Sequence, residues 1–423
     1  MKIKSLCTLL LVLISTCCVS AQSHTVKHTR KTTADKFQIG IFWPPVWAFT
    51  NDEQYKIMKE AHIDVIQNVS STDLYTTDKN RKMLDLAQKH GLKVLVADPR
   101  VHGTPAEIKA MVNDFKSHPA TAGYYIIDEP DTAKLQWCAT THKIIMEADP
   151  QKGAHVNLFP VYALDEQLGN INYEKEYVER WIEMAGPDQL EYLSFDHYPY
   201  DDKGRFRENY YNNMDIIRRA GLKYGIKTSA YLQSFGIPGA FRRPSLGELR
   251  YNVYSFLAYG IKYPVWFTYW TPAGQGEKFL PSIIDTMGRK TELYAYAQQF
   301  NKEMKQLGKT LIALDAKEVY HTGSKLPEHT TALPEDAWLQ PIDPSAALIV
   351  TYFEHQQNGS QYIMLVNKSY KDSQSIRLHV NEKIKQLGHI GNDNDKVQQI
   401  KWNKDREITV NFLPGEGKLY RIK

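Results

Sequence analysis

The chain has 423 residues, more than one ordinary domain needs and enough for two. Hydrophobic residues make up 42% of it and charged residues 24%, the balance of a soluble globular protein. The net charge of +4 is small for this length and no basic stripe is present, so we expect no nucleic-acid partner.

The first 21 residues have the pattern of a secretory signal peptide. A lysine-containing start precedes an apolar run over 6–19, and residues 19–21 form a small-residue cleavage site. We therefore expect export to the periplasm or the cell exterior. Cys17 and Cys18 leave a lipoprotein open as an alternative, which is the one case in which we expect membrane attachment.

Residues 22–36 are polar and basic without periodicity, which predicts a flexible N-terminal segment. Beyond the leader the only cysteine is Cys138, so no intrachain disulfide can form. Cys138 is expected to be a buried apolar filler, and the stability must come from a large core.

From residue 37 onward, short apolar segments alternate with amphipathic ones. The expected strands cover 37–42, 64–69, 93–97, 124–127, 154–158, 192–195, 227–232 and 265–268. The expected helices cover 52–61, 78–90, 105–117, 132–148, 173–185, 207–224, 245–259 and 291–307. Eight such units over 37–312 predict an α/β fold of the (β/α)₈ TIM-barrel type. A doubly wound open sheet is disfavoured because no glycine-rich phosphate loop follows a strand.

The composition changes after residue 313. Strand patterns occur at 347–353, 361–367, 375–380, 407–413 and 418–422, some of them separated by tight-turn signals such as Asn358-Gly359. Residues 313–423 are therefore predicted to form a small all-β sandwich domain that packs on the barrel.

The sequence Gly-Tyr-Tyr-Ile-Ile-Asp-Glu-Pro at 123–130 is the most informative stretch. Its apolar centre is the expected fourth strand, and Asp128 and Glu129 follow at its C-terminal tip. Two adjacent carboxylates there are partly desolvated and repel each other, so at least one pKa should rise. One group can then donate a proton near neutral pH while the other stays charged. The simpler alternative is an aspartate that caps the next helix beside a solvated glutamate.

Active sites of this fold lie at the C-terminal ends of the strands. The other expected strand ends supply Trp43, Asp98, Arg100, Asn157, Asp196, His197, Tyr198, Gln233, Tyr269 and Trp270. Carboxylates for proton transfer and flat rings for stacking on sugars are typical of a glycosidase, and no metal or cofactor is expected. Structural roles remain open for several: core packing for Trp43 and Trp270, a turn at Asp98, and a hydrogen-bonded pair of Asp196 with His197.

With the Asp-Glu pair on the fourth strand, the barrel resembles the glycoside hydrolase superfamily of (β/α)₈ enzymes. The sandwich looks like the all-β domain that often follows such barrels. In the large retaining clan, an acid/base glutamate ends strand four after an asparagine, and a nucleophilic glutamate ends strand seven. Glu129 matches the first, but Asp128 replaces the asparagine and Gln233 ends the seventh strand. A second branch, the hexosaminidases of families 20 and 123, has an adjacent Asp-Glu and no enzyme nucleophile.

The second resemblance implies that the 2-acetamido group of the substrate attacks the anomeric carbon. Asp128 would orient that group, Glu129 would act as general acid/base, and Tyr198 or Tyr269 would bond the acetamido carbonyl. An inverting or nucleophile-using enzyme with Asp196 as the second carboxylate stays open, and so does a non-catalytic glycan-binding protein.

The sequence therefore predicts an exported glycoside hydrolase acting on an oligosaccharide or polysaccharide. One further loop, 236–244, contains adjacent arginines, Arg242 and Arg243. These either contact an acidic sugar or form solvated surface.

Overall fold

The structure, a computed structural model, describes residues 36–69, 76–274, 276–394 and 396–423. The expected signal peptide and nearly all of the N-terminal segment lie outside the described residues. Within the described part of the chain, no helix combines the length and apolar character needed to cross a membrane.

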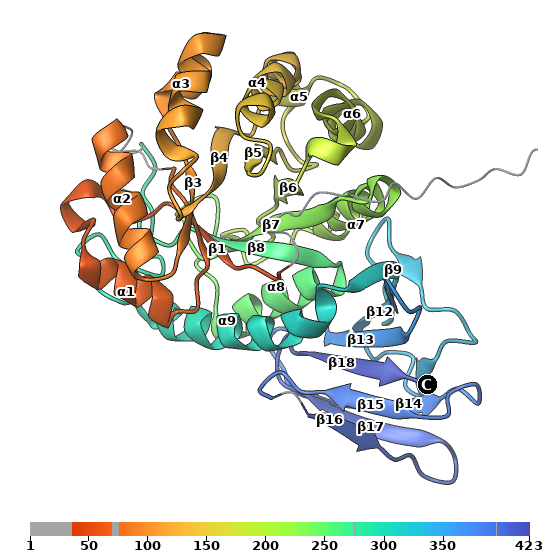
Figure 1. The fold of residues 1–423 in the computed structure, drawn as a ribbon. Helices are drawn as coiled ribbons and strands as arrows, with labels where there is room; N and C mark the ends of the chain where they lie inside the picture. The colour runs from red at the N-terminus through yellow and green to blue at the C-terminus, as the bar shows by residue number, and fades with distance from the viewer. Residues whose placement is uncertain (1–35, 70–75, 275, 395) are drawn as a thin grey trace, which may run out of the picture.

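Eight parallel strands close into a barrel in the order of the sequence (Figure 1). Each expected strand overlaps an observed one. Strand β8 starts four residues earlier than expected because Lys262 interrupts its apolar pattern. Lys262 is nevertheless buried, its ammonium donates to the Leu311 and Leu314 carbonyls, and burial lowers its pKa to about 7. The barrel strands are β1 (Gly40–Phe42), β2 (Val65–Gln67), β3 (Lys93–Val96), β4 (Thr121–Asp128), β5 (Gly153–Leu158), β6 (Tyr192–Asp196), β7 (Lys227–Gln233) and β8 (Ile261–Phe267).

Helices surround the barrel (Figure 1). Their starts follow local capping chemistry: Thr104 with Glu107 and Ser245 with Glu248 form reciprocal capping boxes at α3 and α8. The helix expected over 173–185 consists of the π-helical segment η5 (Tyr173–Glu179) followed by α6. The helices are α1 (Asp52–Glu60), α2 (Thr77–Lys89), α3 (Pro105–Phe115), α4 (Leu135–Ala148), α5 (Asp165–Leu168), α6 (Arg180–Ala185), α7 (Asn209–Tyr224), α8 (Leu246–Ala258) and α9 (Glu292–Leu311).

A buried polar link joins α9 to the barrel. The Trp266 indole donates to Asn301 Oδ1 at 2.8 Å, and Asn301 Nδ2 donates to the Ala61 carbonyl at 2.7 Å. We expect Asn301→Ala to lower the free energy of unfolding by about 1–3 kcal/mol, because it leaves a buried donor and a buried acceptor unpaired. Urea denaturation measures this. Gln299→Ala, on the exposed side of α9, is the control, and equal losses in both variants would contradict the assignment.

The C-terminal domain has two sheets whose side chains share one core. The five expected strands are present. Five more were missed because they are short or polar: β9 alternates charged with apolar residues, and β16 reads Val-Gln-Gln-Ile. The seven-stranded sheet has the order β10 (Thr331–Ala332), β9 (Leu314–His321), β12 (Leu348–His355), β13 (Gln361–Asn367), β18 (Gly417–Ile422), β15 (Leu387–Ile390) and β16 (Val397–Ile400). The three-stranded sheet has the order β11 (Leu339–Pro341), β14 (Gln374–Val380) and β17 (Glu407–Phe412).

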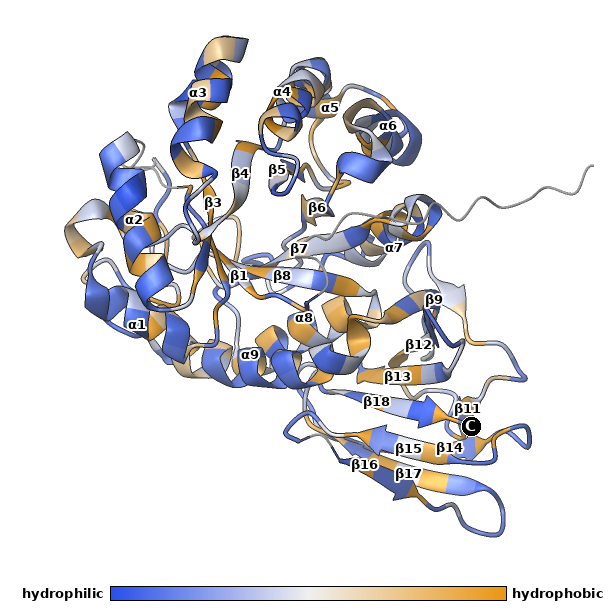
Figure 2. Cartoon of the chain, in the orientation of Figure 1, coloured by the Kyte–Doolittle hydropathy of each residue, from blue (hydrophilic) through white to orange (hydrophobic). Residues whose placement is uncertain are grey.

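The two domains meet along α8, which packs against β12, β13 and β18. Figure 2 shows the apolar character of β13 beside α8. Gly415 allows a close approach: its φ is +70°, and a Cβ there would lie 2.6 Å from the Gly247 carbonyl oxygen. The Arg250 guanidinium also donates to the Pro414 carbonyl at 2.9 Å. The β domain thus packs directly on the barrel wall.

Candidate active site

The tip of β4 is shaped by an irregularity in its pairing with β5, where the register shifts between Tyr125 and Ile127. In a regular strand, residues three apart point to opposite faces. The shift brings Asp128 onto the same side as Tyr125, whose hydroxyl donates to Asp128 Oδ1 at 3.2 Å. Bulges of this kind re-aim side chains near active sites.

A relay of hydrogen bonds across three strand ends fixes the Asp128 carboxylate. Ser194 Oγ donates to Asn157 Oδ1 at 3.0 Å, so the amide nitrogen of Asn157 faces Asp128 and donates to its Oδ1 at 3.1 Å. Asp128 is open to water at the mouth. The surrounding walls desolvate it enough to raise its pKa, although the Asn157 and Tyr125 hydrogen bonds oppose the shift. Asp128 is therefore held firmly while it remains accessible to a ligand.

Glu129 adopts an uncommon backbone conformation, with a φ of 45°. A non-glycine residue in this region costs roughly 1–3 kcal/mol, and such strain clusters at functional sites. Its amide donates to the Asn157 carbonyl at 2.9 Å, which holds the turn in place. The pKa of its carboxyl is raised well above the ordinary value by burial, by the nearby Asp196 and Asp128 charges, and by a hydrogen bond to Asp196. These influences favour the protonated form of the Glu129 carboxyl.

Asp196 completes the carboxyl cluster, by which we mean Asp128, Glu129 and Asp196. It ends β6 and is 6% exposed. Burial and the Asp128 charge raise its pKa, while the hydrogen bond from Glu129 lowers it. Among the described residues its Oδ1 has no hydrogen-bond partner. A buried acceptor without a partner costs stability and suits a ligand hydroxyl or water.

The raised carboxyl pKa values make stability depend on pH. Folded Glu129 binds its proton at pH values where the unfolded chain has released it, so stability falls as pH rises above the ordinary carboxyl pKa. Glu129→Gln removes this titration. We expect the variant to gain thermal stability over the wild type, with the gap widening from about pH 5 to about pH 8. Melting temperatures across this range measure it, and a gap that is constant or narrows would contradict the raised pKa.

Aromatic rings surround the mouth, some half-buried (Trp43, Phe267 and Phe279) and some buried (Tyr198 and Phe235). Trp43 packs against Phe267 and Phe279, each at a ring-centroid distance of 6.0 Å. Tyr198 stacks on Phe267 at 5.3 Å and meets Phe235 edge-on at 4.9 Å. Of these, only Trp43 and Tyr198 were among the predicted site residues, and both lie at the mouth. Flat apolar surface next to carboxyl groups suits a sugar ring.

Three other predicted residues, Asp98, His197 and Gln233, bond other protein groups. Asp98 is buried, caps the turn after β3, and forms a bidentate pair with the Arg100 guanidinium at 2.9 and 2.8 Å. His197 is fully buried with Nδ1 3.1 Å from Asn213 Oδ1 rather than paired with Asp196, and burial lowers its pKa to about 3. Asp98 and His197 thus support the walls of the site.

Gln233 likewise bonds only backbone groups. Its Oε1 accepts from the Tyr200 amide, and its Nε2 donates to the carbonyls of Tyr200 and Arg242, all at 3.1 Å. The side chain is fully buried, so neither end of the amide is free for a substrate.

The prediction that Tyr269 and Trp270 contact the substrate needs correction. Both are at most 1% exposed and belong to the core between the barrel and its helices, where Trp270 packs on Phe49 at 5.0 Å. Because both rings are buried in this core, they offer no surface on which a sugar could stack. The arginines of the 236–244 loop are also occupied, because Arg242 pairs with Glu248 and Arg243 pairs with Glu292.

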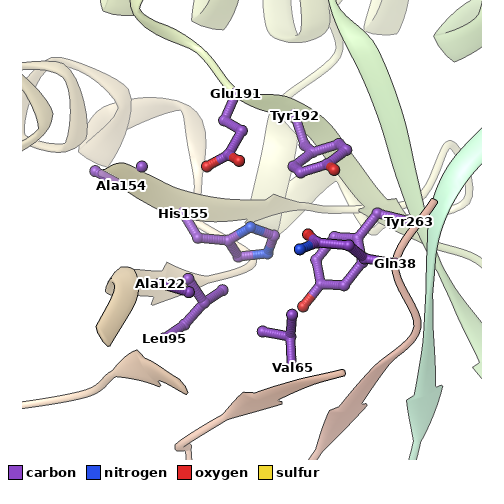
Figure 3. Close-up of a pocket in the computed structure, with 10 residues that line it drawn as sticks. Gln38, Val65, Leu95, Ala122, Ala154, His155, Glu191, Tyr192 and Tyr263 are labelled. Atoms are coloured by element: carbon purple, nitrogen blue, oxygen red, sulfur yellow. The ribbon is translucent and has the colours of Figure 1, made fainter. Parts of the chain in front are cut away.

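Two hollows differ in what they can hold. A cavity of about 460 Å³ lies beside Asp128 and is lined by the ends of β3 and β4, including Ala97, Tyr125 and Ile127. This volume is within the usual range of ligand pockets, roughly 300–1,000 Å³. At the opposite end of the barrel a hollow of about 20 Å³ lies between His155, Tyr192 and Tyr263 (Figure 3). It has room for little more than one water.

Two further observations bear on the chemistry. Within the described ranges no group of three or more His, Cys, Asp or Glu side chains has an arrangement that could hold a metal ion. Cys138 is buried and burial raises the pKa of its thiol to about 12, so it is not an activated nucleophile.

No family model matches the chain, and no curated protein matches it. Solved structures do. A β-galactosidase from Bacillus circulans sp. alkalophilus aligns with a TM-score of 0.60 and 11% identity, covering 92% of this chain and 99% of that one. A glycoside hydrolase family 5 protein from Bacteroides vulgatus ATCC 8482 aligns with a TM-score of 0.55 and 13% identity, covering 91% and 89%.

A β-galactosidase from the psychrophilic Marinomonas ef1, at a TM-score of 0.49 and 11% identity, is longer: the match covers 66% of this chain and 62% of that one. The first two likenesses span both domains. They show that this chain shares its fold, a closed (β/α)₈ barrel followed by a β domain, with these two solved structures.

Proposed function

We propose that this protein is a glycoside hydrolase in which Glu129 is the general acid. The observation that supports this best is the carboxyl cluster at the C-terminal mouth of the barrel, where burial and two neighbouring carboxyls keep Glu129 protonated. Aromatic rings around the cluster offer stacking surface for a sugar. The likeness to solved glycoside hydrolases agrees with this function.

Two ordinary mechanisms fit the geometry poorly. A strand-seven nucleophile is missing because Gln233 stands there and bonds backbone groups. An inverting pair needs its carboxyl groups roughly 6.5–9.5 Å apart, and a retaining pair about 5–5.5 Å apart. The pKa of Glu129 and that of Asp196 each respond to the other carboxyl as a close neighbour, which disfavours the wide separation of an inverting pair.

Substrate-assisted cleavage of 2-acetamido sugars fits better. Asp128 Oδ1 accepts from Tyr125 and Asn157, and no hydrogen bond to Oδ2 is present among the described residues, so Oδ2 can accept the acetamido N–H. The acetamido oxygen then forms a bond to the anomeric carbon as the glycosidic C–O bond breaks, and Glu129 gives its proton to the leaving oxygen. Water next attacks the anomeric carbon and gives a proton to Glu129. The bond between the anomeric carbon and the acetamido oxygen breaks, which restores the open acetamido group. The cavity beside Asp128 has room for the acetamido group.

The proposal includes export of the protein, and one alternative function competes with it. The leader pattern supports export, with the mature protein beginning at Gln22. A glycan-binding protein without catalysis would use the same aromatic mouth.

Paired aryl glycosides that carry either a hydroxyl or an acetamido group at C2 test the proposal. We expect the purified protein to release the aryl group only from the acetamido members, with inhibition by a thiazoline analogue of the cyclised intermediate. Release from the hydroxyl members would contradict substrate assistance. Oligosaccharide binding without release from any member would favour the rival.

A further inference from the structure

Arg207 lies on the loop between β6 and α7 and is half-buried. Its guanidinium carbon is 4.8 Å from the centre of the Tyr162 ring and 4.7 Å from that of Phe241. Its own amide donates to the Pro199 carbonyl at 2.9 Å, which fixes the backbone beneath it. Stacking on two rings holds the guanidinium plane in place and leaves its N–H donors unused.

The arginines around it are already paired. Arg205 pairs with Asp201 at 2.7 Å, and Arg242 pairs with Glu248 at 2.6 Å. Within the described residues, no carboxylate oxygen lies within 4.0 Å of a guanidinium nitrogen of Arg207, and no hydrogen bond from its side chain is present. A half-buried cation without a counter-ion loses part of its hydration and gains no ion pair, and this observation points to an anionic ligand.

Arg207 is also close to the carboxyl cluster. The Tyr162 ring meets the His197 ring edge-on at a centroid distance of 4.7 Å. His197 directly follows Asp196 in the chain. Burial raises the pKa of the Tyr162 hydroxyl most, the charges of Asp196 and Glu129 raise it further, and the charge of Arg207 lowers it. Tyr162 is therefore within electrostatic range of both the carboxyl cluster and the arginine. On the other side, Phe241 packs on Phe235 and Tyr198 of the mouth.

A cavity of about 400 Å³ opens where the guanidinium lies. It is lined by Tyr162, Asp201, Arg205, Phe206, Arg207, Glu208 and Asn209. Of its two carboxylates, Asp201 is neutralised by Arg205, and Glu208 is exposed to water. The cavity thus combines room for a sugar substituent with a cation that, among the described residues, has aromatic neighbours but no carboxylate partner.

We propose that Arg207 binds an anionic group of the glycan, either the carboxylate of a uronic acid or a sulfate ester, next to the bond that is cleaved. The planar fork of a guanidinium matches both groups, and a neutral sugar has no group that requires it. This proposal rests on the proposed function in taking the ligand to be a glycan that is cleaved at the carboxyl cluster. Contact with an acidic sugar, which the sequence suggested for the adjacent arginines Arg242 and Arg243, is thereby assigned to Arg207.

Calorimetric titrations test this without any turnover, using Glu129→Gln as the background. The probes are matched pairs: 4-nitrophenyl β-glucoside with the β-glucuronide, and 4-nitrophenyl N-acetyl-β-glucosaminide with its 6-sulfate. We expect one anionic member to bind at least about tenfold more tightly than its neutral partner, with a preference that weakens as salt is added. Which pair shows the preference distinguishes a uronate from a sulfate.

Adding Arg207→Gln should abolish the preference and leave the affinity for the neutral member unchanged within about twofold. Arg207→Lys should retain part of it because the charge remains. Lys203→Gln, an exposed change of equal charge on the same loop, should retain all of it. Equal binding of neutral and anionic members, or a preference that survives Arg207→Gln, would overturn the proposal. Because the experiment measures binding and not turnover, a failure of the Arg207 proposal can be distinguished from a failure of the proposed hydrolase function.

Discussion

Glu129→Gln should lower kcat/KM on an oligosaccharide with an unactivated leaving group by roughly 10²–10⁴-fold, the usual contribution of a general acid. The amide has nearly the shape of the protonated carboxyl, so the site should keep its geometry but have no proton to donate. Steady-state kinetics with the released sugar as readout measures the loss.

The matched control for this variant is Asp202→Asn, an exposed change of one carboxylate on the loop after β6. We expect its activity to stay within about twofold of the wild type. Wild-type activity in Glu129→Gln, or an equal loss in the control, would mean that the assignment of the acid is incorrect.

Asp128→Asn should lower kcat on 2-acetamido substrates by about a hundredfold, in the range of losing one electrostatic contact to a developing charge. The reason is that the carboxylate is needed most when the cyclised intermediate becomes positively charged. Asn157→Ala should cause a smaller loss, since it removes one of the two hydrogen bonds that orient Asp128.

Thiazoline affinity gives the second readout for Asp128. It should fall together with kcat in Asp128→Asn, because inhibitor and intermediate make the same contact. If kcat falls while thiazoline affinity is unchanged, the carboxylate has a role other than holding the acetamido group.

Much of the barrel could be predicted because its strands are short apolar runs between well-capped helices. Ser245 was recognisable as a helix start, and it forms a capping box with Glu248. The strands that were missed are polar edge strands, such as β16, or have charged residues within them, such as β9. Their stability comes from pairing with neighbours that are distant in sequence, which a local pattern does not report.

The carboxyl cluster could be predicted because each member lies at the C-terminal end of a barrel strand or directly after it. In this fold, side chains at these positions gather at the mouth of the barrel. The surrounding residues could not be assigned in this way. Trp270 follows β8 in sequence but packs outward on Phe49, and the direction of a ring after a strand end depends on loop geometry. Tyr162 and Arg207 were missed because they lie in loops several residues beyond strand ends, and the contact between them joins segments distant in sequence.

The most direct test of Glu129 as the general acid is the leaving-group dependence of the Glu129→Gln variant. A 2,4-dinitrophenyl glycoside needs no protonation of its leaving oxygen, whereas an oligosaccharide does. We predict that the variant keeps most of the wild-type kcat on the dinitrophenyl substrate and loses it on the oligosaccharide. Equal losses on both substrates would contradict the role of Glu129 as proton donor.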